Sequence, residues 1–365
     1  MILFNRRRRL LFAILFVAVL ILEEVYYSKL QIAWHSYYKE VVYRPISVKR
    51  DVSGRLPIAV AIIVEKASHL DYYETAQNTV ECYCKHFGYP LLRIVVDDVP
   101  EIGAKCSQTD FMFRRHCILA ELLRQNPSFE YVLFLDADMG IINPNHLIEE
   151  YINPLDDVTF YERVFNFEVM AGSYIVRNSE KGRTFLTTWA NYEYRVPNSF
   201  HGTDNAALHQ VLVDQFAEND SISRNSTCRS IWEKSRDWDG VWSYVACARS
   251  ILHDRLIFPG ISIRPKVSQR VWARDGWLTN SLWSDKDFIF HGWQTRRLNK
   301  PGFGPFWYPF GGGFDLAKCS TSKVSENWPY KDTFMTTDDV IEYHLREKAA
   351  KVRQMYDKAV DQLSV

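Results

Sequence analysis

The sequence lacks three signatures that assign chains to common classes of enzyme. No G-x-G-x-x-G follows the first predicted strand, so a nicotinamide or flavin dinucleotide site is not expected. The absence of G-x-x-x-x-G-K-[ST] argues against a P-loop ATPase, and the absence of G-x-S-x-G argues against an α/β-hydrolase. Internal repeats are also absent.

An excess of charge of either sign is missing as well. The chain has 44 basic and 44 acidic residues and a formal net charge of zero, so nothing indicates a general affinity for nucleic acid. Its 365 residues suffice for one large domain or two ordinary ones. The 47% hydrophobic and 15% aromatic shares predict a folded protein with a sizeable core.

Cysteines are few and odd in number. Seven cysteines fit an oxidising compartment but cannot all pair, and their spacing does not match a zinc ribbon. We expect a bridge between Cys228 and Cys247, and we expect Cys117 to be a buried helix residue rather than a nucleophile. Two sequons, at Asn219 and Asn225, lie in one polar segment and fit exposed glycosylation sites in a lumen.

No apolar run reaches the about 20 residues that span a bilayer. The run at residues 10–22 follows four arginines at 6–9, and no convincing cleavage site comes after it. We predict a cytoplasmic tail at 1–9, a transmembrane signal anchor at 10–22 and a stem at 23–56, with the rest of the chain in the lumen. A cleaved signal peptide and a soluble start are the alternatives.

The pattern after the stem predicts a doubly wound α/β domain over residues 57–310, with a mostly parallel sheet flanked by helices. Strands are expected at 58–64, 91–96, 131–135, 157–161 and 169–176, and helices at 69–86, 111–124, 179–194 and 204–216. Residues 311–365 are predicted to be a loop and an amphipathic helix that docks through Ile341, Leu345, Val352, Met355 and Leu363. The stretch 301–314, rich in Gly and Pro, is either a flap or irregular aromatic packing.

The stretch YVLFLDADMGIINP, residues 131–144, is the most informative. A strand buried on both faces delivers Asp136 and Asp138 to a turn at the edge of the sheet, where ligands gather. Two carboxylates on one side suit Mg²⁺ or Mn²⁺. The pattern Asp-x-Asp also occurs at 237–239 and 285–287, and the alternative for Asp136 and Asp138 is a turn with a helix cap near His146.

A later stretch, DFIFHGW at 287–293, offers a third ligand. A short strand is expected to end at His291, and Gly292 permits close backbone approach. Neutral imidazole suits Mn²⁺ beside two carboxylates. The alternative is a histidine that is hydrogen-bonded in an irregular core.

Several motifs in order resemble the nucleotide-sugar glycosyltransferases of the GT-A fold. The motifs are DAD with INP (136–144), AGSYIVRN (171–178), HGTDNAALHQVL (201–212) and HGW (291–293). The chain is similar to the fungal α-galactosyl/mannosyltransferases and plant xyloglucan xylosyltransferases. It is more similar still to a nematode-expanded family of uncharacterised putative transferases, marked by FLDAD, MAGSY, FHGTDN and ARDGWLTN.

The resemblance implies roles for particular residues. Asp136 and Asp138 match the acidic pair that binds metal and nucleotide sugar, and His291 matches the late metal ligand. Gly172 and Ser173 match a segment that lines the donor-sugar pocket. Asp204 and Asn205 match an Asp-Gln pair near sugar hydroxyls, with an amide one methylene shorter at Asn205.

Three polar residues have competing interpretations. Asp204 is a general base if the reaction inverts, or a helix N-terminal carboxylate bonded to backbone amides. Arg115 approaches the diphosphate or forms an exposed salt bridge. Lys300 is a further candidate for the phosphates.

The expected function is that of a single-pass type II protein of the Golgi or ER membrane. It would use Mn²⁺ or Mg²⁺ to move a hexose or pentose from a UDP- or GDP-sugar to a glycan or glycoprotein acceptor, with retention suggested by the resemblance. An alternative is a catalytically inactive glycan-binding or scaffolding membrane protein. A metal-dependent phosphohydrolase would need more clustered ligands than the sequence offers.

Overall fold

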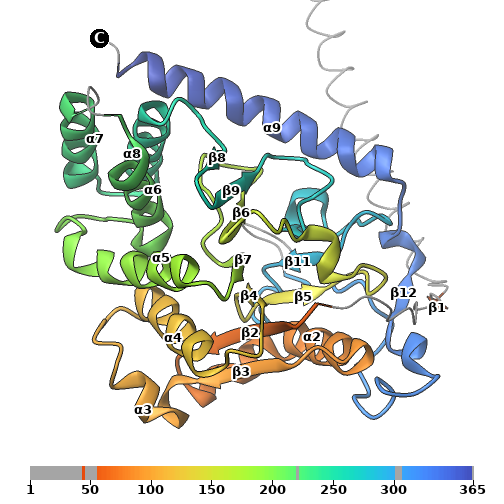
Figure 1. Ribbon diagram of the computed structural model, residues 1–365. Helices are drawn as coiled ribbons and strands as arrows, with labels where there is room; N and C mark the ends of the chain where they lie inside the picture. The colour runs from red at the N-terminus through yellow and green to blue at the C-terminus, as the bar shows by residue number, and fades with distance from the viewer. Residues whose placement is uncertain (1–42, 46–55, 219–221, 301–305, 364–365) are drawn as a thin grey trace, which may run out of the picture.

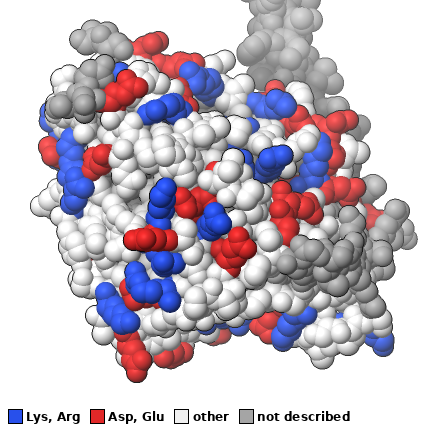
Figure 2. Space-filling model, viewed as in Figure 1, with Lys and Arg blue, Asp and Glu red and all other residues white. Residues whose placement is uncertain are grey.

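The computed structural model describes residues 43–45, 56–218, 222–300 and 306–363. The predicted tail and anchor, most of the stem and the Asn219 sequon lie outside these residues. Among the described residues, no helix has the length and apolar character needed to cross a membrane. On the face shown in Figure 2, basic and acidic side chains are interspersed, as the zero net charge suggests.

A central seven-stranded sheet organises the fold (Figure 1), in the order β3-β2-β4-β7-β6-β9-β8. Its strands are β2 (Ile58–Val64), β3 (Leu91–Val95), β4 (Tyr131–Leu135), β6 (Val158–Tyr161), β7 (Ser173–Arg177), β8 (Ile257–Phe258) and β9 (Ile261–Arg264). Strand β7 lies between β4 and β6 and runs antiparallel to both, and β8 is antiparallel to β9. The other three pairings are parallel. The sheet is therefore mixed, and the prediction of a mostly parallel sheet was wrong.

Helices cover both faces of this sheet, which explains why β2 and β4 are apolar throughout. Alternate residues of β2 point to opposite faces, and all seven are buried. One face packs on a core that includes α4 (Phe111–Gln125), α5 (Glu180–Ala190), α6 (Thr203–Phe216), α7 (Ile222–Lys234) and α8 (Trp238–Ile251). The other face packs on α2 (Glu74–Phe87) and on the C-terminal part of the chain.

A small second sheet brings the end of β4 to a distant part of the chain. Its order is β10 (Ala273–Asp275), β11 (Ile289–His291) and β5 (Met139–Ile141). In its register, His291 lies opposite Asp275 on one side and Met139 on the other. Residues about 150 positions apart in the sequence thus become neighbours through backbone pairing.

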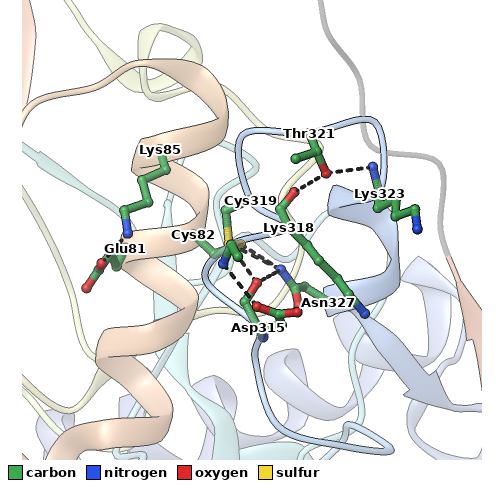
Figure 3. Close-up of a disulfide and its surroundings, with 10 residues drawn as sticks. Glu81, Cys82, Lys85, Asp315, Lys318, Cys319, Thr321, Lys323 and Asn327 are labelled. Carbon is green, nitrogen blue, oxygen red and sulfur yellow. Dashed lines mark hydrogen bonds and ion pairs between the residues drawn. A yellow bond between two sulfur atoms is a disulfide. The ribbon is translucent and has the colours of Figure 1, made fainter.

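The described residues form three disulfides. The predicted Cys228–Cys247 bridge is confirmed. Cys117 is a buried residue of α4, as predicted, and it pairs with Cys106, whereas Cys84 is the free, buried cysteine. Cys82 of α2 pairs with Cys319, and Asn327 donates to both sulfurs (Figure 3), which fixes the C-terminal segment on α2.

The C-terminal region ends in α9 (Asp338–Asp361), which crosses the molecule in Figure 1. Ile341, Leu345 and Val352 are buried as predicted, but Met355 is 53% exposed and the adjacent Tyr356 docks in its place. The described part of 301–314 packs as an aromatic cluster, with Phe310 against Trp293, Phe314 and Tyr330. A short sheet of β1 (Tyr43–Pro45) and β12 (Pro329–Lys331) adjoins it.

The second sequon does not have the exposure that we expected. Asn225 lies in α7, is half-buried, and its side-chain oxygen accepts a hydrogen bond from Gln210 Nε2 at 2.9 Å. The regular helix therefore holds this amide against the domain.

Candidate functional site

The end of β4 is locked in place by backbone contacts on two sides. The Asp136 amide donates to the Gly172 carbonyl at 2.7 Å. The Asp138 carbonyl accepts from the amides of Gly292 and Trp293, at 3.0 and 2.8 Å. A Cβ on Gly172 would lie 2.1 Å from Asp136 Oδ2, so only glycine leaves room for this carboxylate. These contacts place Asp136 and Asp138 beside the end of β11.

Asp136, Asp138 and His291 come together as the sequence predicted. Each offers a ligand atom, and these atoms lie within 4.8 Å of one another. His291 Nε2 is 3.4 Å from Asp138 Oδ1. In the part of the chain that the structure describes, no other group of three such residues could hold an ion. Two carboxylates and one imidazole fit Mn²⁺ or Mg²⁺ and leave coordination positions for a substrate.

Asp275 orients the imidazole. His291 Nδ1 lies 2.8 Å from Asp275 Oδ1, and Arg163 donates to the same oxygen at 2.7 Å. With Nδ1–H donating to the carboxylate, Nε2 is left to face Asp138, the arrangement that metal-binding histidines commonly have. Sequence reasoning missed Asp275, although it lies in the ARDGWLTN motif that marked the resemblance.

Electrostatics in the site favour ionised carboxylates beside a charged imidazole. Burial lowers the pKa of His291, but Asp138 and Asp275 outweigh it and raise the pKa to about 10. Burial raises the pKa of Asp138, while His291, Gln294 and Arg297 bring it down to about 2. Burial keeps the pKa of Asp136 above its usual value despite Arg115. A cation that binds Nε2 must therefore displace a proton.

Arg115 and Asp204 form a buried support beneath Asp136. Arg115 is only 3% exposed, so the alternative of an exposed salt bridge was wrong. Its guanidinium contacts Asp136 Oδ1 and, at 2.6 Å, Asp204 Oδ2. Asp204 is fully buried and also accepts from His116 Nε2 at 2.9 Å. Its carboxylate thus bonds to side chains, in place of the backbone amides of the alternative interpretation.

The pKa values of Asp204 and His116 show which of these buried groups are charged at pH 7. Burial raises the pKa of Asp204, but Arg115 and His116 lower it to about 2. Burial and the nearby Arg115 lower the pKa of His116 to about 4, against the opposing effect of Asp204. His116 is therefore neutral at pH 7, and its Nε2 carries the hydrogen that Asp204 accepts, which leaves Nδ1 to accept from the Tyr174 hydroxyl at 2.9 Å.

A cavity of about 320 Å³ opens over the metal-ligand candidates. Arg115, Asp136, Ala137, Asp138 and Gln294 line one end. The remaining lining residues come from the end of β2, the turn after it and the start of α4: Ile63, Val64, Glu65, His69, Tyr73, Phe111 and Met112. A cavity of this size, with mixed apolar and charged walls, suits a small-molecule ligand.

Two arginines that the sequence analysis did not single out flank the cavity. Gln294 donates to Asp138 Oδ2 at 2.7 Å and accepts from Arg296 Nε at 2.8 Å. Arg296 and Arg297 both lower the pKa of Tyr73, which burial and the two aspartates raise overall. Their positive charge therefore acts on the metal end of the cavity. Their position three and four residues after HGW was the available signal in the sequence.

Ser173, Asn205 and Lys300, which the sequence also predicted for the site, do not line the cavity. Ser173 is fully buried and its hydroxyl accepts from Trp272 Nε1 at 2.8 Å. Asn205 is half-buried, and its side-chain oxygen lies 3.4 Å from the Ala171 amide. Lys300 is exposed and is not among the described residues that line the cavity.

In comparisons with known proteins, a family model described as "Protein of unknown function, DUF273" matches residues 80–304. No curated protein matches the chain. A solved glycosyltransferase involved in the glycosylation of the major capsid of PBCV-1 is 19% identical, with a TM-score of 0.33, over 44% of this chain and 75% of that one.

The glycosyltransferase GlyE of Streptococcus pneumoniae TIGR4 is 13% identical, with a TM-score of 0.31, over 55% of this chain and 63% of that one. The apo form of GlyE is 12% identical, with a TM-score of 0.32, over 55% of this chain and 64% of that one. The chain thus spans just under two thirds of GlyE. A likeness at this level carries no argument about fold or function, so the function has to be inferred from the geometry of the site.

Proposed function

The chain belongs to the DUF273 family of proteins of unknown function, and we propose that it is a metal-dependent glycosyltransferase. In this proposal it moves a hexose or pentose from a UDP- or GDP-sugar to a glycan or glycoprotein acceptor. The observation that carries the proposal is the convergence of Asp136, Asp138 and His291 at one end of a cavity that arginines flank. Such an end suits a diphosphate, and the cavity beyond it suits a nucleoside.

The three ligand candidates would hold Mn²⁺ or Mg²⁺, which neutralises charge on the departing diphosphate when bound. The fit is supported by the hard oxygen donors of Asp136 and Asp138 and by the orientation of His291. Asp275 holds the proton of His291 on Nδ1, so that Nε2 remains a donor to the ion.

Arg296 and Arg297 would bind the phosphates directly. Both arginines lower the pKa of Tyr73, and Arg297 also lowers the pKa of Asp138, whereas Lys300 is exposed and does not line the cavity. We therefore assign the phosphate contact to the arginines in preference to Lys300. Arg115 is already bonded to two carboxylates, so its part is to hold Asp136 in position.

The buried state of Asp204 supports a positioning role. A general base must reach the acceptor hydroxyl, and Asp204 is fully buried with Oδ2 bonded to Arg115 and His116. Its partner in the motif, Asn205, approaches the Ala171 amide next to Gly172, which keeps an amide near the proposed sugar position.

Retention of the anomeric configuration is the proposed outcome. Among the described residues, the carboxylates that line the cavity are Asp136, Asp138 and Glu65. The first two are assigned to the ion, so neither is left to act as a base for an inverting reaction. Glu65 and His69 also line the cavity, and retention is proposed here on the resemblance to retaining families. NMR of the anomeric proton in the product would contradict the proposal if it showed inversion.

A luminal location is proposed with it. Three disulfides among the described residues support an oxidising compartment. The N-terminal sequence of arginines followed by an apolar run supports an anchor in the Golgi or ER membrane.

The direct test measures metal-dependent hydrolysis of a panel of UDP- and GDP-sugars by the purified chain. Asp138→Ala and His291→Ala are expected to abolish hydrolysis, with thermal unfolding used to confirm that each variant is folded. Asp285→Ala is the matched control, because Asp285 belongs to another Asp-x-Asp sequence and is exposed. Normal rates in both site variants would refute the assignment. Glycan binding that is indifferent to metal, without donor hydrolysis, would favour the inactive scaffold instead.

A further inference from the structure

Several aromatic side chains among the described residues are exposed to solvent. Among the described residues, five aromatic side chains are largely exposed: Tyr72, Tyr194, Phe200, Trp238 and Tyr343. Tyr72 precedes Tyr73 of the cavity lining, and Tyr343 lies on α9. Exposed aromatic rings that are scattered singly need no explanation, but rings in mutual contact beside a proposed site suggest a ligand.

Phe200 and Trp238 form such a contact. Their rings meet edge to face, with centroids 5.1 Å apart, and they are 41% and 47% exposed. Both backbones are fixed: the Ser235 hydroxyl donates to the Phe200 carbonyl at 2.6 Å, and Asp237 caps α8 through the Gly240 amide at 2.9 Å. The two rings are therefore held ready in a set orientation, which reduces the entropy lost on binding.

A short, rigid stretch of chain connects this pair to the proposed reaction centre. Phe200 begins the sequence FHGTD, which ends at Asp204, so the two Cα atoms are at most about 14 Å apart. The loop is fixed by Trp232 Nε1, which donates to the His201 carbonyl at 2.9 Å. From Asp204, Arg115 leads directly to Asp136.

The start of α4 connects the loop that carries Phe200 with the cavity. Asp110 caps α4 and is followed by Phe111 and Met112, which line the cavity. His201 and Asp204 both act electrostatically on Asp110, so the loop that carries Phe200 lies against this end of α4. The two rings thus lie on the α4 and α6 side of the cavity.

We infer that Phe200 and Trp238 bind the sugar rings of the acceptor glycan. The inference rests on the proposed glycosyl transfer and identifies where that reaction takes its acceptor. Flat aromatic faces suit the C–H faces of pyranose rings, and the exposed neighbours Arg236, Asp237 and Asp239 supply groups for hydroxyls. Two rings among charged residues are a small apolar area for a stable protein interface, which favours a carbohydrate.

The test uses the purified full-length chain on a printed array of oligosaccharides, with Mn²⁺ and nucleoside diphosphate binding measured in parallel by calorimetry. Trp238→Ala and Phe200→Ala are each expected to weaken oligosaccharide binding by about tenfold or more, while the nucleotide affinity stays unchanged. Trp238→Phe keeps a ring and is expected to retain most of the binding. Tyr343→Ala removes a more exposed ring from α9 and is expected to have no effect.

The outcomes separate this inference from the proposed function. If UDP and GDP bind with metal but Trp238→Ala and Phe200→Ala bind the array as well as the unaltered chain does, the inference is overturned and the transferase proposal stands. If the unaltered chain binds no oligosaccharide on the array, the inference is likewise overturned. If oligosaccharides bind through these rings but no nucleotide binds with metal, the transferase proposal fails and the glycan site remains.

Discussion

Replacing Asp275 by asparagine is expected to weaken Mn²⁺ binding and to change its dependence on pH. In the metal-free protein, the two aspartates raise the pKa of His291 to about 10. This pKa lies about 3 units above pH 7, so at pH 7 the ion must displace a bound proton from His291 at a cost of about 4 kcal/mol. The affinity of the unaltered chain should therefore rise about tenfold for each pH unit from 6 to 9, with one proton released per ion.

Asp275→Asn acts in two opposing ways. It removes a negative charge 2.8 Å from His291 Nδ1, so the pKa of His291 falls toward its usual value and the proton competes less. It also replaces the carboxylate that orients the ring by a neutral amide oxygen, a weaker acceptor, and changes of this kind typically cost about 10- to 100-fold in metal affinity. The loss should thus be larger near pH 9 than near pH 6, and fewer protons should be released per ion.

Calorimetry with Mn²⁺ in two buffers of different ionisation enthalpy measures both the metal affinity and the number of protons released per ion. Asp287→Asn is the matched control, because Asp287 is a buried carboxylate paired with Arg274 in the same region without contact to His291 in the described structure. It should lose stability with no change in the pH dependence of metal binding. Parallel affinity curves for Asp275→Asn and the unaltered chain across this pH range would refute the reasoning.

Three further changes have expected outcomes. Arg115→Ala leaves the buried Asp204 and the half-buried Asp136 without their cation and should lower the free energy of unfolding by about 3–5 kcal/mol in urea titrations, whereas no loss would show the pairs to be unimportant. Gly172→Ala places a Cβ 2.1 Å from a metal-site carboxylate oxygen and should weaken Mn²⁺ binding in calorimetry, whereas Gly312→Ala meets nothing within 4 Å and serves as control. Cys82→Ser opens a disulfide that closes 237 residues and should cost about 2–5 kcal/mol; an equal cost for Cys84→Ala, at the free cysteine, would contradict this.

Much of the fold could be predicted because burial leaves a direct record in the sequence. Strand β4 was predicted with its observed bounds, since each of its residues is apolar or aromatic and each is buried. The antiparallel insertion of β7 could not be predicted in this way, because its apolar residues would suit either direction of pairing. Tyr356 docks in place of Met355 for a related reason: a helix can rotate slightly to bury the larger neighbouring side chain.

Some residues of the candidate site could be predicted from the sequence and others could not. Asp136 and Asp138 could be found because they follow an apolar strand, and His291 because it ends a short strand in the series of motifs that carries the resemblance. Asp275, Arg163 and Gln294 could not, because nothing in their local sequence shows which group a polar side chain will face. Arg115 was misjudged for the same reason, since only its position in the fold shows that two carboxylates enclose it.

The sequence by itself determined which segments are buried, where β4 ends and which side chains there can hold a cation, because these depend on local patterning and residue chemistry. The tertiary structure alone decided that β11 pairs with β5, which sets His291 beside Asp138 from more than 150 residues away. It also decided which charges are paired and therefore where the pKa values lie. Those properties depend on distances and desolvation, which chain order does not contain.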